Sequence, residues 1–338
     1  MKQASKLLLL ITVVVIITSS CDQNTSKKES QLVPQTLIEI PLDGPITKKK
    51  AELSGMAWLD EDTLVLLPQY PDVFGTPGIL FTISKQAILD YLDHKSVEPI
   101  LPGMIILDMP NFRDMIPDYE GFEAIEFHDK NIYLTIESGK GNHMMGYLIS
   151  GVVSANNKEI QIDASQMTKI PPPIQLDNRT DEALLIDQGK IYTFFEANGA
   201  SINSYPVAHV FDLNLNALGT VSFPHLEFRV TDTAMGTDDG IWVINQISQK
   251  DIDILPQFDP LSNTSPQVTS SATFMHVERL VKLNLDGKGF TIADFPPIQI
   301  KLGDTPRNWE GLAILDNRGF LLVTDKSPDT ILGFVQMP

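Results

Sequence analysis

The segment Glu310–Asp325 reads EGLAILDNRGFLLVTD, and it shows the plan on which most of this chain is built. A short apolar strand opens on a polar or acidic residue, a turn carries Asp, Asn or Gly, and a second apolar strand closes on an acid or an amide. Four other segments follow the same plan: SGMAWLDEDTLVLLPQ (Ser54–Gln69), EAIEFHDKNIYLTIE (Glu123–Glu137), EALLIDQGKIYTFFE (Glu182–Glu196) and DTAMGTDDGIWVINQ (Asp232–Gln246). The opening and closing residues are 14 or 15 positions apart in all five. This constancy predicts five β-hairpins with tight turns.

A third and a fourth strand are expected to accompany each hairpin. The third strand follows the hairpin after a loop, as in GILFTIS from Gly78. The fourth strand ends on a proline in every repeat: Pro41, Pro110, Pro171, Pro224 and Pro296. Proline suits an outermost strand, because such a strand has no neighbour to pair with the missing N–H. Four strands repeated five times predict an all-β fold, a β-propeller of five four-stranded blades.

The N-terminal strand is expected to close this ring. The strand that ends at Pro41 precedes the first hairpin, whereas the last repeat stops after its third strand at Pro338. The first strand of the chain would therefore complete the last blade. Six blades are the alternative, and a sixth could lie only in residues 247–277. That segment is rich in Ser, Thr, Asn and Pro and lacks the hairpin pattern, so we interpret it as a long functional loop. A short helix is expected to begin after Ser84.

Residues 1–20 have the layout of a signal peptide. Two lysines precede an apolar run from Leu7 to Ile17, which is too short for a membrane span of about 20 residues. Cys21, the single cysteine, follows small residues as in a bacterial lipobox, although Thr18 stands where that motif usually has Leu. We predict that Cys21 carries a lipid; an ordinary thiol near a conventional cleavage site is the alternative.

The rest of the chain divides into two parts on this interpretation. Residues 21–34 would be a polar tether, and residues 35–338 a single β-propeller domain. The mature protein would be an exported lipoprotein, held to the membrane through its lipid and facing the periplasm or the cell surface. Without another cysteine it could form no disulfide, and it is expected to be a monomer.

The composition limits the possible partners. The 338 residues include 25 Lys and Arg against 43 Asp and Glu, which gives a net charge of −18. Sequence-independent nucleic-acid binding needs clustered basic residues, so this balance argues against it. Cations are the more natural small partners.

Part of the negative charge is expected to converge on one point. The first strand of each propeller blade lines the central channel, so the residues that open the five hairpins should form a ring: Ser54, Glu123, Glu182, Asp232 and Glu310. Crowded carboxylates oppose one another's ionisation, and a hard cation relieves this. An oxygen-only ligand set suits calcium better than zinc. The phase of the fourth hairpin leaves Thr231 as an alternative to Asp232.

Basic residues near the ring are candidates for ligand contacts. Arg179, Arg229 and Arg307 each stand three residues before a ring acid, and Lys140 and His143 lie in the loop GKGNH of the second repeat. The arginines could form a positive crown that holds the phosphate or carboxylate of a small anionic ligand. Alternatively, they could pair with the acids and take the place of a metal.

Several of these motifs resemble a known family. ELSGMAW, DYEGFEAIEF, RTDEALLI and NWEGLAILDNRGFLLVTDKS are similar to the strand motifs of the phytase-like (esterase-like) propeller domain of bacterial secreted proteins, over residues 52–338. The order of the ring residues is similar to that of the calcium ligands in the five-bladed calcium-activated nucleotidases. The resemblance implies a bound calcium and hydrolysis of phosphoesters. The chain departs from the nucleotidases because it has no recognisable phosphate-binding segment rich in Asp and Arg near its N-terminus.

Two functions therefore remain open from the sequence. The first is a calcium-dependent phosphoester hydrolase, for which no catalytic residue can be named. The second is a non-catalytic propeller that binds a ligand or a protein and uses calcium only as a structural ion.

Overall fold

The computed structural model describes residues 33–247, 276–327 and 329–338, together with residues 251, 254, 256 and 258–261. The predicted signal peptide and Cys21 lie outside the described residues, as do most of the tether and most of the loop 247–277. Residues 32–338 form one compact unit. No helix among the described residues is both long and apolar enough to span a membrane.

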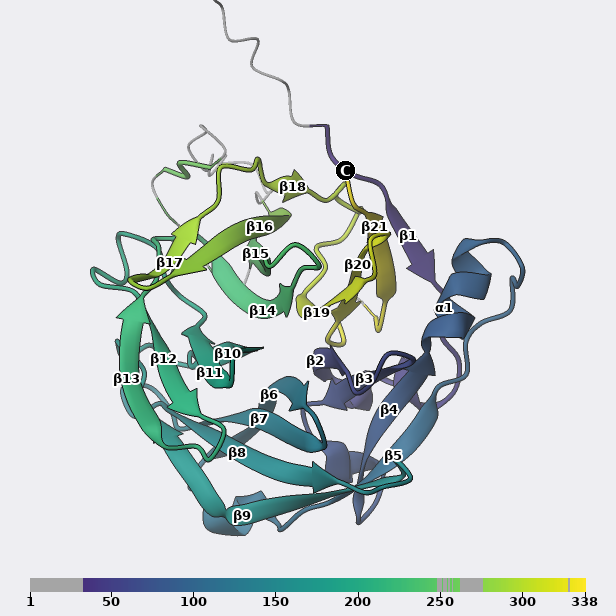
Figure 1. Ribbon diagram of the computed structural model, residues 1–338, viewed down its shortest axis with the longest axis horizontal. Helices are drawn as coiled ribbons and strands as arrows, with labels where there is room; N and C mark the ends of the chain where they lie inside the picture. Colours follow the sequence, from purple (N-terminus) through teal and green to yellow (C-terminus); the bar gives the residue numbers. More distant parts are fainter. Residues whose placement is uncertain are drawn as a thin grey trace, which may run out of the picture. The chain divides into compact units, whose positions relative to one another are not determined.

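The described chain is almost entirely β-structure, as predicted, and its strands form antiparallel meanders of four (Figure 1). The first contains β2 (Leu53–Trp58), β3 (Thr63–Pro68), β4 (Gly78–Ser84) and β5 (Gly103–Asp108). The second contains β6 (Tyr119–His128), β7 (Asn131–Ser138), β8 (Met145–Val153) and β9 (Glu159–Ile170). The third contains β10 (Asp181–Asp187), β11 (Lys190–Phe195), β12 (Val207–Asp212) and β13 (Ala217–Ser222).

Two further meanders complete the described strands. The fourth contains β14 (Arg229–Met235), β15 (Ile241–Ile247), β16 (Val277–Asp286) and β17 (Gly289–Ile292), and the short β18 (Ile298–Gln299) also pairs with β16. The fifth contains β19 (Trp309–Leu315), β20 (Gly319–Thr324), β21 (Leu332–Gln336) and β1 (Leu37–Ile40). The first two strands of each meander are the five predicted hairpins.

The first strands of the meanders lie side by side in a ring. Strand β2 packs beside β6, β6 beside β10, β10 beside β14, β14 beside β19, and β19 beside β2 again. Because these strands are innermost, the ends at which they begin face a common central space (Figure 1).

The outermost strands connect neighbouring meanders through short parallel pairings. Strand β5 pairs with β9, and β13 pairs with β17 through Ser222 and Gly289. Gly289 has φ 134°, and a Cβ there would lie 2.4 Å from the Ser222 carbonyl oxygen, so this approach requires glycine. These pairings merge the meanders into larger sheets.

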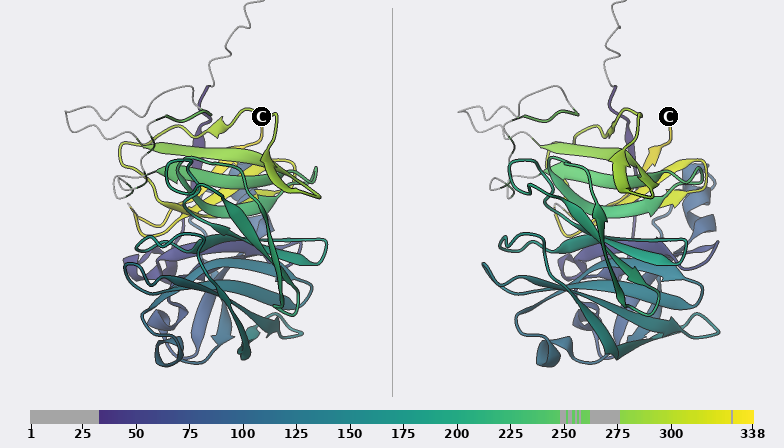
Figure 2. Two further views of the ribbon diagram at one scale, coloured as in Figure 1. Left: turned by 90° about the vertical axis from the view of Figure 1, so that its left-hand side faces the viewer. Right: turned by 60° about the vertical axis from the view of Figure 1, so that its left-hand side comes forward.

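The N-terminal strand β1 is the outermost strand of the last meander. It pairs antiparallel with β21, from the far end of the chain, and the two lie side by side in Figures 1 and 2. Single parallel bridges from Gln35 to Ile300 and from Leu42 to Ile100 connect the flanks of β1 to the fourth and first meanders. The start of the described chain thus contacts three meanders.

The core lies between the meanders, in separate apolar clusters. In β3, Val65 and Leu67 belong to the cluster shared with the second meander, whereas Leu64 and Leu66 belong to the cluster shared with the fifth. Alternate side chains of a strand point to opposite faces, so a strand buried on both faces must be apolar throughout. This explains the continuous apolar runs of the hairpins.

The remaining described elements are short helices. As predicted, α1 (Lys85–Leu92) begins after Ser84, whose hydroxyl accepts a hydrogen bond from the Ala87 amide at 3.2 Å. A four-residue helix, α2 (Phe112–Met115), and three 3₁₀ turns at residues 45–47, 49–51 and 71–74 lie in connections.

Candidate functional site

Four of the five predicted ring residues occupy equivalent irregular positions in the innermost strands. Ser54, Glu123, Glu182 and Glu310 each lie where the register of their hairpin shifts by one residue. Such a β-bulge leaves one residue without a partner and re-aims its side chain. All four residues line one central cavity.

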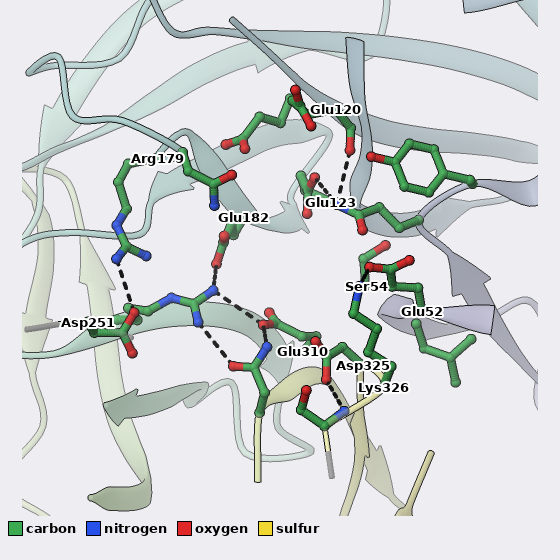
Figure 3. Close-up of a pocket in the computed structure, with 18 of the residues that line it drawn as sticks. Glu52, Ser54, Glu120, Glu123, Arg179, Glu182, Asp251, Glu310, Asp325 and Lys326 are labelled. Atoms are coloured by element: carbon green, nitrogen blue, oxygen red, sulfur yellow. Dashed lines mark hydrogen bonds and ion pairs between the residues drawn. The ribbon is translucent and has the colours of Figure 1, made fainter. Parts of the chain in front are cut away.

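This cavity has a volume of about 800 Å³ and is strongly acidic (Figure 3). Three of its lining residues are basic: Arg179, Arg229 and Lys326. Nine are acidic: Glu52, Glu120, Glu123, Glu137, Asp177, Glu182, Asp251, Glu310 and Asp325. The excess of carboxyl groups indicates a site for a cation rather than for a free anion.

The fifth predicted ring position is not brought to the cavity. The register shift in β14 spans two residues, Thr231 and Asp232, and both side chains form hydrogen bonds elsewhere. The Asp232 carboxylate accepts hydrogen bonds from the amides of Leu312 at 2.7 Å and Thr233 at 2.8 Å. The Thr231 hydroxyl donates to the Trp309 carbonyl oxygen at 2.7 Å. Neither alternative for this position therefore lines the cavity.

Arg229, at the start of β14, lines the cavity from the fourth meander. Its Nη2 donates to Glu182 Oε2 at 2.7 Å and to Glu310 Oε1 at 3.2 Å. Its Nε donates to Glu196 Oε2 at 2.5 Å, and its Nη1 donates to Asn308 Oδ1 at 3.0 Å. All three guanidinium nitrogens are thus engaged, and Arg229 compensates three buried carboxylates at once.

The other predicted ligand-contact residues have different positions. Arg179 lines the cavity, and its guanidinium donates to Glu196 and Asp251 at 2.9 and 3.0 Å. Arg307, Lys140 and His143 are not among the lining residues. The Arg307 side chain binds Glu278 at 2.6 Å, and Lys140 forms an exposed pair with Asp118. The expected positive crown is therefore reduced to two arginines that both bind carboxylates.

On the side of the cavity near Ser54, the buried polar side chains have few hydrogen-bond partners. The Ser54 hydroxyl is buried and has no hydrogen-bond partner. Glu123 accepts one hydrogen bond from Gln69 at 3.1 Å, and Glu137 accepts one from Thr180 at 2.8 Å. Neither glutamate forms an ion pair with any of the residues that the structure describes. This side therefore retains carboxylates without a paired cation.

Burial shifts the protonation of these groups. Burial, followed by repulsion from Glu137, raises the pKa of Glu123 well above its usual value. Burial and repulsion from Glu196 raise the pKa of Glu137 to about 7. Around neutral pH this side of the cavity must therefore either take up protons or bind a cation.

The side-chain atoms that could act as metal ligands in the cavity limit which metal ion would fit. Within the described part of the chain, no three His, Cys, Asp or Glu side chains form a ready metal site. The side of Ser54 instead offers two carboxylates, a hydroxyl without a partner and the side-chain oxygen of Gln69. Calcium accepts such mixed oxygen ligands and completes its 6–8 ligands with water, whereas zinc favours His and Cys. The residues present therefore fit calcium.

Several site residues were not singled out from the sequence. Gln69, Glu137 and Asp325 line the cavity, and Glu196 binds both of its arginines. All four close one of the five repeated hairpins, opposite the residue that opens it. The repeated acid or amide at the closing position was the available signal, since both ends of a hairpin lie at the same edge of the sheet.

Comparisons with known proteins support the fold alone. No family model matches the chain, and no curated protein matches it. An exo-β-1,3-galactanase from Phanerochaete chrysosporium is 8% identical with a TM-score of 0.50, covering 88% of this chain and 64% of that one. A glucose dehydrogenase is 12% identical with a TM-score of 0.45, covering 89% and 99%. An α-L-arabinofuranosidase from Podospora anserina is 9% identical with a TM-score of 0.45, covering 90% and 97%. The ring of five meanders and the similarity to the galactanase therefore indicate a propeller-like all-β fold.

Proposed function

We propose that this chain is a β-propeller of five four-stranded blades, closed by β1, that binds calcium in its central cavity. The observation that carries the proposal is the convergence of Ser54, Glu123, Glu182 and Glu310, each at a β-bulge of a different innermost strand, on one acidic cavity. Five meanders whose first strands form a ring support the blade count.

Calcium is favoured by the chemistry of the donors. The side chains on the Ser54 side offer oxygen atoms for a hard cation. Burial first, and then repulsion from neighbouring carboxylates, raises the pKa values of Glu123 and Glu137. A bound ion would offset this repulsion and stabilise the fold.

Export and lipid attachment at Cys21 belong to the same proposal, with support from the sequence of residues 1–21 alone. The protein would then act outside the cytoplasm, held to a membrane by its lipid. The expected monomer leaves the mouth of the cavity accessible.

Hydrolysis of phosphoesters, as in the phytase-like domains, is a second candidate function. A cavity of about 800 Å³ has room for a small ligand beside an ion. A bound metal ion can polarise a phosphoryl oxygen and lower the pKa of a water molecule. However, three of the five predicted anion contacts, Arg307, Lys140 and His143, do not line the cavity. The acidic lining therefore favours the non-catalytic alternative, a binding propeller with a structural calcium.

The test is thermal melting of the purified protein with EDTA, with calcium and with magnesium, together with metal analysis. Calcium at 100 times its dissociation constant should stabilise the fold by about 2.7 kcal/mol. Glu123→Gln should remove most of this gain, whereas Glu159→Gln, which alters an exposed residue of β9, should retain it. Equal melting temperatures in EDTA and calcium, with no bound metal, would refute the proposal. A panel of phosphoesters with calcium would then separate hydrolysis from binding.

A further inference from the structure

The central cavity already contains one cation that belongs to the protein. Arg229 is buried, and its guanidinium lies between the carboxylates of Glu182, Glu196 and Glu310 at 2.5–3.2 Å. Asn308 accepts its remaining bond. A group fixed by four partners on three different segments is a permanent part of the site.

The β-bulge in β14 explains why the fourth meander contributes Arg229 to the cavity. The other four innermost strands each aim at least one bulged residue at the cavity, and β6 aims two, Glu120 and Glu123. In the bulge of β14, by contrast, the side chains of Thr231 and Asp232 form hydrogen bonds with β19. The fourth meander therefore contributes no oxygen ligand from this position. It contributes the Arg229 side chain instead, and the acids of the third and fifth meanders converge on that side chain.

The side of the cavity formed by the first two meanders has no group that joins several acids. Lys326 pairs there with Glu52, whereas Glu123 and Glu137 form no ion pair among the described residues. Figure 3 shows Ser54, Glu120 and Glu123 across the cavity from Arg179 and Asp251. Ser54 is 5% exposed, and its hydroxyl has no hydrogen-bond partner among the residues that the structure describes, so its oxygen is available to a ligand in the cavity. Leaving a buried polar group without a partner destabilises the fold, and a ligand at this position would offset that cost.

From this difference we infer that basic residues of the protein compensate the acids on one side of the cavity, and that an exchangeable cation binds on the other side. The Arg229 guanidinium permanently compensates Glu182 and Glu310, and one exchangeable divalent cation binds between Ser54, Glu123 and Glu137. The inference rests on the proposed calcium binding and replaces a ring of equivalent ligands with a site on one side. It assigns Glu137, which closes its hairpin, as a ligand, and it excludes Glu182 as one.

The experiment is calorimetric titration of calcium into the purified wild-type protein and three variants at one pH. One site per chain is expected. Glu123→Gln and Ser54→Ala should weaken calcium binding, the first by about tenfold or more, because it removes a charged ligand. Glu182→Gln makes the same chemical change at an equivalent bulge and distinguishes the two arrangements. The one-sided site predicts a change in the dissociation constant below about threefold, whereas a ring of equivalent ligands predicts a loss like that of Glu123→Gln. Circular dichroism melting verifies that each variant is folded; if Glu182→Gln is not, Glu310→Gln takes its place.

The outcomes separate this inference from the proposed function. Loss of calcium binding in Glu182→Gln as large as that in Glu123→Gln would overturn the one-sided site but leave calcium binding intact. Unchanged binding in Glu123→Gln would overturn it as well. Absence of calcium binding in the wild-type protein would refute the proposed function itself. Titration of Glu137→Gln provides an independent check, since a ring formed only by the opening residues of the hairpins predicts no effect there.

Discussion

Replacing Arg229 with glutamine tests the internal cation directly. The change removes the only group that donates to Glu182, Glu196 and Glu310 together, while it keeps a polar side chain of moderate size. Removing one partner of a buried ion pair costs about 3–5 kcal/mol, because the remaining charge stays buried without compensation. With three carboxylates affected, we expect the upper part of that range at pH 8 in the presence of EDTA.

The cost should depend on pH in a defined direction. Burial already raises the pKa of Glu310 to about 8, although Arg229 opposes the shift. An acid whose pKa is raised in the folded state is most favourable to folding below its unfolded pKa, and this contribution is lost as the pH rises through the folded pKa. Without Arg229 the folded pKa values of Glu182 and Glu310 rise further, so at pH 5 these two carboxyl groups are protonated and need no counter-ion. The difference in stability between wild type and variant should therefore be smaller at pH 5 than at pH 8.

Urea denaturation at both pH values measures this difference. Arg318→Gln is the control, because Arg318 forms a partly exposed pair with Asp93 at 2.8 Å and should contribute about 1 kcal/mol or less. A loss below about 1 kcal/mol for Arg229→Gln at pH 8, or an equal loss at both pH values, would refute the role of Arg229 as a buried counter-ion.

Three other predictions concern the fold. His209 Nδ1 donates to Asp181 Oδ2 at 3.1 Å. Burial lowers the pKa of His209, but the hydrogen bond and charge of this carboxylate outweigh burial and raise it. His209→Asn should therefore lose about 1–2 kcal/mol below pH 6.5 and less as the pH rises through the folded pKa, as urea melts at pH 6 and pH 9 would show; a constant loss would contradict the pairing. Gly289→Ala should cost about 2 kcal/mol or more in thermal melts because of the contact with β13, whereas Gly287→Ala, with no atom within 4 Å of the added Cβ, should cost less than half as much. Trp58 Nε1 donates to a carbonyl oxygen of the fifth meander at 2.9 Å, so Trp58→Phe should cost about 1 kcal/mol in urea melts, and an unchanged midpoint would show that this bond is not needed.

The hairpins could be predicted from the sequence because their information is local. The apolar run of β3 and its turn lie within one short segment. Both faces of this strand are buried between meanders, so nearly every position of the run is apolar and can be recognised in the sequence. The prolines that follow the outermost strands could also be recognised in the sequence. The parallel pairings between outer strands could not be predicted, since each depends on a few residues and on a close approach such as that at Gly289.

The candidate site was predictable only in part. The opening residues of four hairpins converge as expected, because equivalent positions of a repeated unit become neighbours in space. Asp232 does not, since the repeat pattern does not reveal that a bulge contains two residues instead of one. The partners of Arg229 come from the third and fifth meanders, and their spacing in the sequence gives no indication that one guanidinium joins them.

The pairing of β1 with β21 sets an order for folding. Leu37 pairs with Val335, so one of the first strands to be synthesised must wait for one of the last. Contacts between such distant parts of the chain form late, because closing a long loop costs entropy before any contact repays it. Until β21 is available, the last meander lacks its full set of strands and the ring stays open. The chain can therefore complete its fold only after β21 has been synthesised, however early the other meanders form.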